Sequence, residues 1–278
     1  MYETNYHRAA STEEAVKLMG KAGDGKFMAG GQTLIPTMKQ RLAAPTDIID
    51  LRHIAAMKGI TVNGDSVTIG AATTHAEVAG SKELRSVCPG LADLAGMIGD
   101  PAVRNKGTIG GSIANNDPAA DYPAACLALN ATIITNKRKI PADEFFQGLF
   151  ETALEDGELI LKVSFPVPSK AAYMKFPNPA SRFALVGVFV AKKGRDVRVA
   201  VTGAGSNGVF RAANFEAALT AKFHVKSLEG VNASKDGLNT DIHADAEFSE
   251  PIQRYLITPR KISLFIEYAV VGQTDLSV

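Results

Sequence analysis

Two glycine-centred segments carry the residue types best suited to binding a charged ligand. The first is residues 29–34 (AGGQTL), directly after an apolar run, and the second is residues 108–121 (TIGGSIANNDPAAD). Paired glycines let a backbone approach a ligand closely and adopt φ values that side chains forbid. Their N–H groups, followed by the hydroxyls of Thr33 and Ser112, can surround a diphosphate without a lysine, because several backbone dipoles converge on the charge. We expect both loops to hold the same diphosphate.

Neither segment matches the common nucleotide-binding fingerprints. Gly30-Gly31 is not part of G-x-G-x-x-G, and G-x-x-x-x-G-K-[ST] does not occur in the chain. A generic dinucleotide fold or a P-loop kinase is therefore disfavoured. A single Gly-Gly is also typical of a plain turn, and for each loop that alternative stays open.

The second loop ends in two aspartates, Asp117 and Asp121, separated by Pro118 and two alanines. A carboxylate there can accept hydrogen bonds from the hydroxyls or the ring N–H of a cofactor. The alternative is that Asp121 caps a helix expected over residues 122–129. Asn115 and Asn116 have the same two interpretations, as turn residues or as ligand contacts.

Short strands and helices must position these loops. The first fifty residues predict a β-α-β-α-β arrangement, in which Ser11 begins a helix with the S-x-x-E spacing of a capping box. The apolar residues around Asn63-Gly64 alternate as in a hairpin, and this pair should supply the positive φ values of its turn. Pro101 is expected to end a helical stretch. The other expected helices cover residues 33–42, 74–78, 90–98, 215–223 and 259–271, and the expected strands cover 27–29, 47–51, 131–135, 159–165, 186–192 and 197–202.

Composition excludes several classes of protein. The chain has 278 residues, 46% of them apolar, and a net charge of +1, which predicts about two domains and leaves no basic excess for nucleic acid. No apolar run is long enough for a transmembrane segment, and the N-terminus lacks a signal core, so we expect a cytoplasmic protein. Two cysteines, Cys88 and Cys126, cannot hold an iron–sulfur cluster, and five scattered histidines give no metal-ligand pair.

With these motifs the chain resembles the FAD-binding medium subunit of the molybdenum hydroxylases, the family of bacterial carbon monoxide dehydrogenase, quinoline oxidoreductase and xanthine dehydrogenase. The resemblance covers nearly the whole chain in the same order, and the D-P-A-A-D tail of the second loop is its most specific part. The matching segments are residues 29–36, 108–121, 143–148, 158–160 and 179–184.

The resemblance implies an α+β fold. It predicts a two-subdomain FAD-binding region of the vanillyl-alcohol-oxidase/PCMH type over residues 1–168, with subdomains at about 1–52 and 53–168, followed by a C-terminal α+β flavoprotein domain over 169–278. The boundary falls at Pro166-Val167-Pro168. The cofactor-binding residues that it implies are Lys26, Ala29, Gly30, Gly31, Gln32, Thr33, Leu34, Ile98, Thr108, Ile109, Gly110, Gly111, Ser112, Ala114, Asn115, Asp117, Asp121, Ile160, Lys175 and Phe183, the last beside the isoalloxazine.

The implied function is electron transfer through FAD, with no catalytic or metal-ligating residue in this chain. A large subunit would hold the molybdenum cofactor, a small subunit would hold [2Fe–2S] clusters, and an external acceptor would take the electrons. The extra iron–sulfur cluster of the 4-hydroxybenzoyl-CoA reductases has no ligands here, and the tail from Ile257 is less regular than the family's final helix. The alternatives are a self-contained flavin oxidase or reductase and a non-catalytic nucleotide-binding module.

Overall fold

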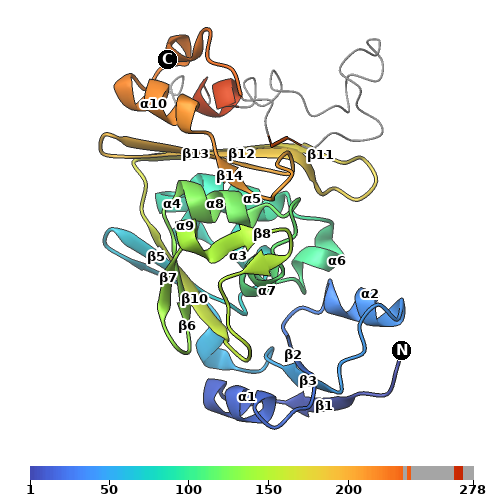
Figure 1. The fold of residues 1–278 in the computed structure, drawn as a ribbon. Coiled ribbons are helices and arrows are strands. Elements are labelled where there is room, and N and C mark those ends of the chain that lie inside the picture. Colours follow the sequence, from blue (N-terminus) through green and yellow to red (C-terminus); the bar gives the residue numbers. More distant parts are fainter. Residues whose placement is uncertain (234–236, 239–265, 272–278) are drawn as a thin grey trace, which may run out of the picture.

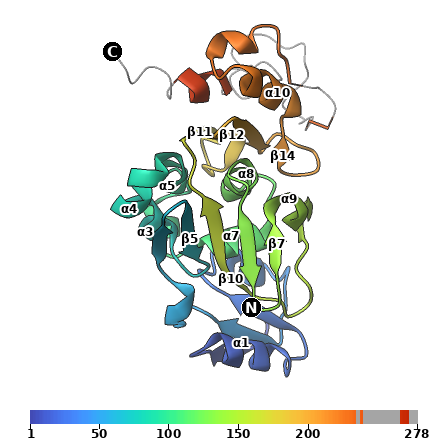
Figure 2. The ribbon, with the colours of Figure 1, turned by 90° about the vertical axis from the view of Figure 1, so that its left-hand side faces the viewer.

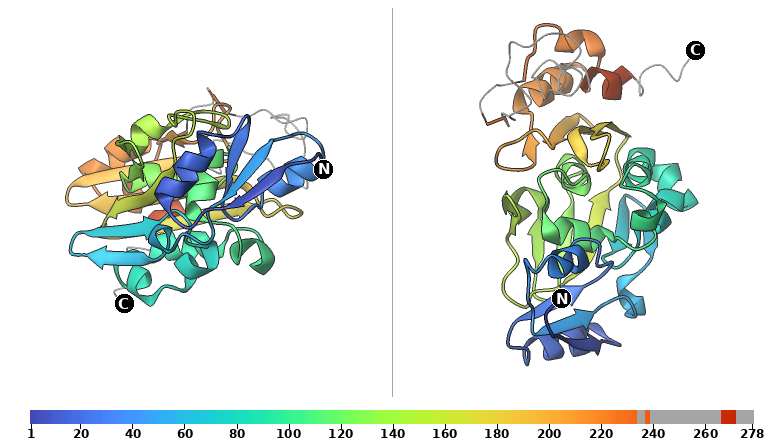
Figure 3. Two further views of the ribbon diagram at one scale, coloured as in Figure 1. Left: turned by 90° about the horizontal axis from the view of Figure 1, so that it is seen from below. Right: turned by 90° about the vertical axis from the view of Figure 1, so that its right-hand side faces the viewer.

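The computed structural model describes residues 1–233, 237–238 and 266–271. Within them, three larger β-sheets follow one another along the chain, beside a small two-stranded ribbon, and most of the helices lie between the second large sheet and the third (Figure 1). Two views from other sides show the same order, with the N-terminal sheet at one end and the third sheet near the other (Figure 2 and Figure 3, right). The largely antiparallel strands and the separate run of helices in the described ranges agree with the predicted α+β class.

The N-terminal sheet is parallel, in the order β1-β3-β2. Its elements are β1 (Asn5–Arg8), α1 (Thr12–Met19), β2 (Gly25–Met28), α2 (Leu34–Lys39) and β3 (Asp47–Asp50). The predicted β-α-β-α-β arrangement is confirmed. The Ser11 hydroxyl accepts a hydrogen bond from the Glu14 amide, whereas the Glu14 carboxylate accepts one from the amide of Ala10. The loop between β2 and α2 contains the first glycine pair.

The second sheet is antiparallel, in the order β4-β5-β10-β6-β7. Its strands are β4 (Ile60–Asn63), β5 (Ser66–Gly70), β6 (Thr132–Thr135), β7 (Lys139–Pro141) and β10 (Ile160–Pro166), after the 3-10 turn η1 (Ala55–Met57). Between β5 and β6 run α3 (His75–Gly80), α4 (Lys82–Val87), α5 (Pro89–Gly96), α6 (Pro101–Arg104), α7 (Ile109–Asn115) and α8 (Tyr122–Ala128). A short helix and ribbon follow β7, namely α9 (Ala142–Phe145), β8 (Phe146–Gly148) and β9 (Glu151–Thr152). The second glycine pair therefore lies in α7.

The third sheet is antiparallel, in the order β11-β12-β13-β14. It comprises β11 (Lys170–Pro177), β12 (Ala184–Lys193), β13 (Asp196–Thr202) and β14 (Phe210–Arg211), followed by α10 (Ala213–Ala221) and the 3-10 turn η2 (Val225–Leu228). Helices α5 and α8 pack on one face, and α10 packs on the other (Figure 2). Every residue of α8 is buried, and the hydrophobic core that contains α8 also includes Tyr173 and Phe189 of the third sheet. The predicted boundary near residue 168 falls between β10 and β11.

Three local predictions are wrong. The two-residue hairpin loop is Gly64-Asp65, because Asn63 pairs with Ser66 and only Gly64 of the expected pair has a positive φ. Pro101 begins α6 instead of ending a helix, since proline is favoured in a first turn and the Asp100 side chain caps it by accepting from the Val103 amide. Helix α2 is shorter than expected at both ends. The helix expected over 259–271 lies outside the described residues except for 266–271, which are helical.

Candidate functional site

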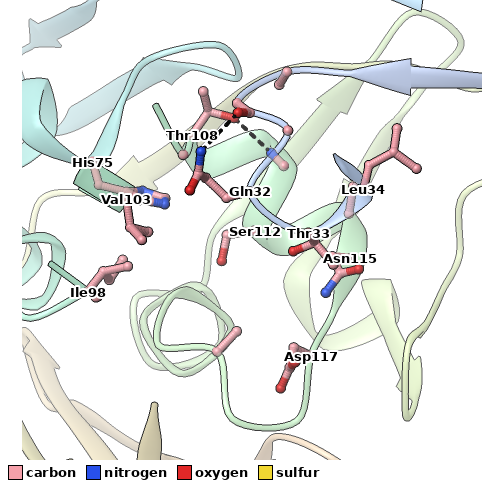
Figure 4. A pocket seen from close by; sticks show the side chains of 18 of the residues that line it. Gln32, Thr33, Leu34, His75, Ile98, Val103, Thr108, Ser112, Asn115 and Asp117 are labelled. Carbon is pink, nitrogen blue, oxygen red and sulfur yellow. Dashed lines mark hydrogen bonds between the residues drawn. The ribbon is translucent and has the colours of Figure 1, made fainter. Parts of the chain in front are cut away.

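A cavity of about 560 Å³ opens where the N-terminal sheet, the central helices and the loop between β11 and β12 meet (Figure 4). Its volume lies within the roughly 300–1,000 Å³ typical of ligand sites. A smaller cavity of about 90 Å³ adjoins it and shares the walls formed by Phe27, Ala29, Gly111 and Ala114. The predicted cofactor-binding residues that line the larger cavity are Lys26, Ala29, Gly30, Gly31, Gln32, Thr33, Leu34, Ile98, Thr108, Gly111, Ser112, Ala114, Asn115, Asp117, Asp121 and Phe183.

The remaining four predicted residues lie behind these walls. Gly110 and Ile160 line the smaller cavity. Ile109 is fully buried in the core and lines neither cavity. Lys175 also lines neither, but its ammonium contacts Asp121, which does line the larger one. Residues that face the larger cavity and residues that support its wall are therefore neighbours in the sequence, as Gly111 and Gly110 are.

The first glycine loop presents a run of unused backbone donors to the larger cavity. Gly31 has a φ of +69°, a conformation that glycine adopts readily. A Cβ on Gly30 would lie 2.1 Å from the carbonyl oxygen of Lys106, so only glycine permits this approach to the segment before α7. Among the described residues, none accepts a hydrogen bond from the backbone N–H groups of residues 30–33. Consecutive free N–H groups around a positive-φ residue form a concave site for an anion.

The two glycines of the second loop have different roles. The N–H of Gly110 donates to the Ala71 carbonyl at 2.9 Å, and a Cβ there would lie 2.6 Å from the Ala71 Cβ. Gly110 is therefore required for packing against the end of β5. The N–H of Gly111 donates to the Thr108 hydroxyl at 3.1 Å, and a Cβ there would point toward Ala29, whose Cβ would be 3.9 Å away. Gly111 thus lies where the two loops face each other.

The two interpretations of the loop's asparagines and aspartates separate clearly. Asn116 has a left-handed backbone and is buried, and its side-chain amide donates to the carbonyls of Gly148 and Glu151. It is an anchor for the β8–β9 ribbon. The Asp117 carboxylate accepts from the Ala119 amide within its own turn. Asn115 and Asp117 line the larger cavity, and Asn116 does not.

Asp121 does not cap α8, because its side chain turns to the third sheet. Its carboxylate accepts a hydrogen bond from the Tyr173 hydroxyl at 2.5 Å and forms an ion pair with the Lys175 ammonium at 3.0 Å. The Lys175 ammonium also donates to the carbonyl of Met97 at 3.1 Å. Burial raises the pKa of Asp121, and the positive charge of Lys175 opposes that rise. This buried cluster joins α8, β11 and the segment that carries Ile98.

His75, which the sequence did not single out, also lines the cavity. It is the first residue of α3, is only 4% exposed, and its ring lies against that of Tyr122 with the centroids 5.4 Å apart. Its Nδ1 is buried and has no hydrogen-bond partner among the described residues. Burial, followed by the positive charge of Arg104, lowers the pKa of His75 to about 4. The only sequence signal was T-H at a helix start, which is too common to indicate a site.

The shifted pKa of His75 predicts a pH-dependent stability. Because the folded pKa is below the usual 6.5, unfolded chains bind more protons between pH 6.5 and 4, and the free energy of unfolding falls as the pH falls through that window. The expected loss is about 3 kcal/mol, levelling off below pH 4. Urea unfolding of the full chain and of His75→Gln measures it, and the variant should lack most of this slope. An equal slope in both proteins would contradict the assignment.

Acidic groups give a separate window in the same experiment. Burial raises the pKa of Asp50 and Glu158, but hydrogen bonds from Arg52 and Arg138 outweigh it and bring both values to about 2. Their contribution to stability is present above the ordinary carboxyl range and is lost as the pH falls toward 2. It should be the same in wild type and in His75→Gln.

The loop between β11 and β12 closes one side of the cavity. The Asn178 side chain accepts from the amides of Ala180 and Ser181, which fixes the turn. Arg182 has a φ of +62°, and the Phe183 side chain is 49% exposed. Ser181, Arg182 and Phe183 all line the cavity, so an arginine that the sequence did not indicate stands beside the predicted aromatic residue.

Comparison with known proteins identifies this architecture. The family described as "FAD binding domain in molybdopterin dehydrogenase" matches residues 2–168, which is more than half of the chain. The chain belongs to this family. The matched residues include both glycine loops, and FAD as cofactor, the oxidoreductase class and the α+β flavoprotein fold are confirmed.

Similar proteins extend the similarity over nearly the whole chain. The carbon monoxide dehydrogenase medium chain of Hydrogenophaga pseudoflava is 34% identical, over 87% of this chain and 90% of the relative. The nicotine 6-hydroxylase medium subunit of Paenarthrobacter nicotinovorans is 33% identical, over 91% and 94%. A chain of reconstituted CO dehydrogenase from Oligotropha carboxidovorans superimposes with a TM-score of 0.82 at 30% identity, over 98% of both chains. Among the described residues, no helix has the length and apolar character needed to cross a membrane.

Proposed function

We propose that this chain is the FAD-carrying medium subunit of a molybdenum hydroxylase. In this proposal it takes electrons from [2Fe–2S] clusters of a small subunit and passes them to an external acceptor, while a large subunit holds the molybdenum cofactor. The names of the relatives, medium chain and medium subunit, support an assembly with larger and smaller partners. A cytoplasmic location stays a prediction.

The supporting observation is the run of unpaired N–H groups at residues 30–33, which faces Gly111 across the cavity. Four consecutive donors without an acceptor among the described residues fit a diphosphate better than a neutral ligand. The hydroxyls of Thr33 and Ser112 line the same cavity and can donate to phosphate oxygens. The adjoining small cavity has mainly apolar walls, including Leu51, Met57 and Ile160, which suit part of the adenine ring. The residues present therefore fit FAD.

The two sides of the cavity suit different parts of the cofactor. The glycine loops hold the diphosphate, and the other side of the cavity, with Ile98, Val103 and Phe183, offers apolar surface for a flat ring system. The Asp121–Lys175 pair fixes the segment at Met97 against α8 and β11, and so sets the shape of that wall. When bound, FAD supplies chemistry with one or two electrons, and the chain positions it and limits its access to water. We assign no acid, base or nucleophile to the chain.

Purification tests the proposal directly. The full chain should bind about one FAD, released on heating and seen by its visible absorption, because the site is built for a single dinucleotide. Coexpressed with its partners, it should be isolated in a complex that contains molybdenum and iron–sulfur clusters. The isolated chain should not hydroxylate carbon monoxide, N-heterocycles or aldehydes, although its reduced flavin should reduce artificial dyes.

Each alternative function has its own result in that experiment. Turnover of such a substrate by the isolated chain would support a self-contained flavin oxidase or reductase and defeat the subunit proposal. A chain that binds ADP but no flavin would support a non-catalytic nucleotide-binding module. The substrates named for the two relatives, carbon monoxide and nicotine, differ greatly in size and polarity, so we do not extend either of them to this chain.

A further inference from the structure

His75 is a buried polar residue of the cavity wall, and its imidazole makes no hydrogen bond to any described residue. Its ring is almost fully buried, and Nδ1 is without a partner in the part of the chain that the structure describes. A buried polar group left without a hydrogen bond costs free energy, which makes Nδ1 unusual in this wall. Nδ1 is enclosed by protein, whereas Nε2 also has no partner among the described residues and is not fully enclosed, so Nε2 is the ring nitrogen that a ligand in the cavity can reach. The only ring against which His75 packs in the described ranges is that of Tyr122, whose hydroxyl is itself buried and unpartnered.

The backbone around His75 holds the ring in place. The amide of His75 donates to the Gly107 carbonyl at 3.0 Å, and Thr74 forms an isolated bridge with Thr108. A Cβ on Gly107 would lie 2.6 Å from Nε2 of His75, so a glycine is needed for the ring to fit. The start of α3 is therefore fixed to the segment that leads into α7, and the imidazole cannot leave the cavity wall by a simple rotation of the helix.

The position of His75 indicates which half of the ligand it faces. Its side chain points toward the cavity from the same side as the apolar side chains of Ile98 and Val103 (Figure 4). Thr33 and Asn115 lie on the opposite side, near the unpaired amides that suit the diphosphate (Figure 4). A flat heterocycle with polar edges fits apolar walls that carry one hydrogen-bonding group.

We infer that His75 is a cofactor-binding residue that hydrogen-bonds the isoalloxazine or the adjoining ribityl hydroxyls of the bound flavin. The inference rests on the proposed function and adds to it a residue that recognises the flavin half specifically. At neutral pH the ring is uncharged, because burial and Arg104 lower the pKa of His75, so one ring nitrogen donates and the other accepts. The charged groups that line this side are Asp121, which is paired with Lys175, and Arg182, which stands beside Phe183. Arg104 lies behind the wall and donates to the carbonyls of Ile98 and Gly99.

The test compares three probes on the flavin-free full chain: FAD, FMN and ADP. FMN contains the ring and the ribityl chain, whereas ADP contains the diphosphate and adenine. His75→Leu should raise the Kd for FAD and for FMN about 3- to 10-fold, the effect of one lost hydrogen bond, and leave the Kd for ADP within about twofold. His75→Gln, which keeps a donor and an acceptor, should recover most of the affinity. The visible spectrum of bound flavin should shift in His75→Leu but not in the control Tyr122→Phe, which alters the neighbouring ring without touching the cavity.

Several results would overturn the inference. Equal Kd values for all probes in wild type and His75→Leu would leave His75 a packing residue. An equal loss for ADP would place it at the diphosphate. If His75→Leu does not fold, as judged by urea unfolding, His75→Ala, which also lacks a hydrogen-bonding side chain, replaces it with the same expected selectivity for flavin over ADP. A wild-type chain that binds none of the flavin probes defeats the proposed function, which is a different outcome from a wild-type chain that binds FAD with no contribution from His75.

Discussion

Gly111→Val is expected to weaken FAD binding by about 100-fold or more, while the free energy of unfolding of the flavin-free chain changes by less than about 1 kcal/mol. Gly111 has an exposed, helical backbone, so valine is compatible with its conformation. The closest atom to an added Cβ is the Thr108 hydroxyl at 3.1 Å, which can shift by a few tenths of an ångström. The remaining methyl groups then extend into the space between the two loops. Titration with FAD followed by flavin fluorescence, together with urea unfolding, measures both quantities.

Two other glycines provide the controls. Gly80→Val places the same side chain at a helix end where an added Cβ has no neighbour within 4 Å, and it should leave FAD binding unchanged. Gly110→Ala should instead affect stability more than FAD binding, because its Cβ would collide with the backbone of Ala71. We expect it to lower the free energy of unfolding by about 1–3 kcal/mol. Normal FAD content in Gly111→Val would refute the position given to the diphosphate.

The contrast between Gly110 and Gly111 shows what the sequence could and could not predict. The pattern of glycines, hydroxyls and aspartates predicted that both loops serve one site, and the structure places both loops on one cavity. That this site holds a diphosphate stays a prediction. Which of two adjacent glycines faces the ligand depends on the rotation of α7 against β5. That rotation is set by packing with Ala71, forty residues earlier in the chain, and no local pattern encodes it.

Secondary structure was predicted best where periodicity and turn chemistry agree. The alternation around residues 60–70 and the S-x-x-E spacing after Ser11 gave correct elements. Proline and asparagine were less informative, because Pro101 begins a helix and Asn63 stays in its strand. His75 was missed for another reason: a buried histidine is usually satisfied by its neighbours, and only the three-dimensional surroundings reveal that this one is not.

The loss of Asp121 should have the largest effect on the fold. In Asp121→Ala the Lys175 ammonium, whose side chain is 2% exposed, keeps the Met97 carbonyl as its one acceptor among the described residues, and the Tyr173 hydroxyl loses its acceptor. Breaking a buried ion pair by removing one partner typically costs 3–5 kcal/mol, because the remaining charge cannot return to water. We expect a loss of about 3–5 kcal/mol in the free energy of unfolding, and weaker FAD binding because the wall at Ile98 loses its support.

A double variant separates this electrostatic cost from simple loss of packing. Asp121→Leu combined with Lys175→Met removes both charges and keeps apolar volume, and it should recover most of the lost stability, since a buried pair replaced by apolar residues is often nearly neutral. The exposed pair Lys137–Glu155 is the matched control, and Lys137→Ala should cost less than about 1 kcal/mol. If Asp121→Ala lowered the free energy of unfolding as little as Lys137→Ala does, the Asp121–Lys175–Tyr173 cluster could not be what fixes α8 to β11. In that case the double variant should bind FAD no more tightly than Asp121→Ala. The recovery of stability and the recovery of FAD binding must therefore be measured in the same proteins, because we expect stability to recover for the most part and FAD binding to recover less. Asp121 also lines the cavity, and leucine cannot accept a hydrogen bond there.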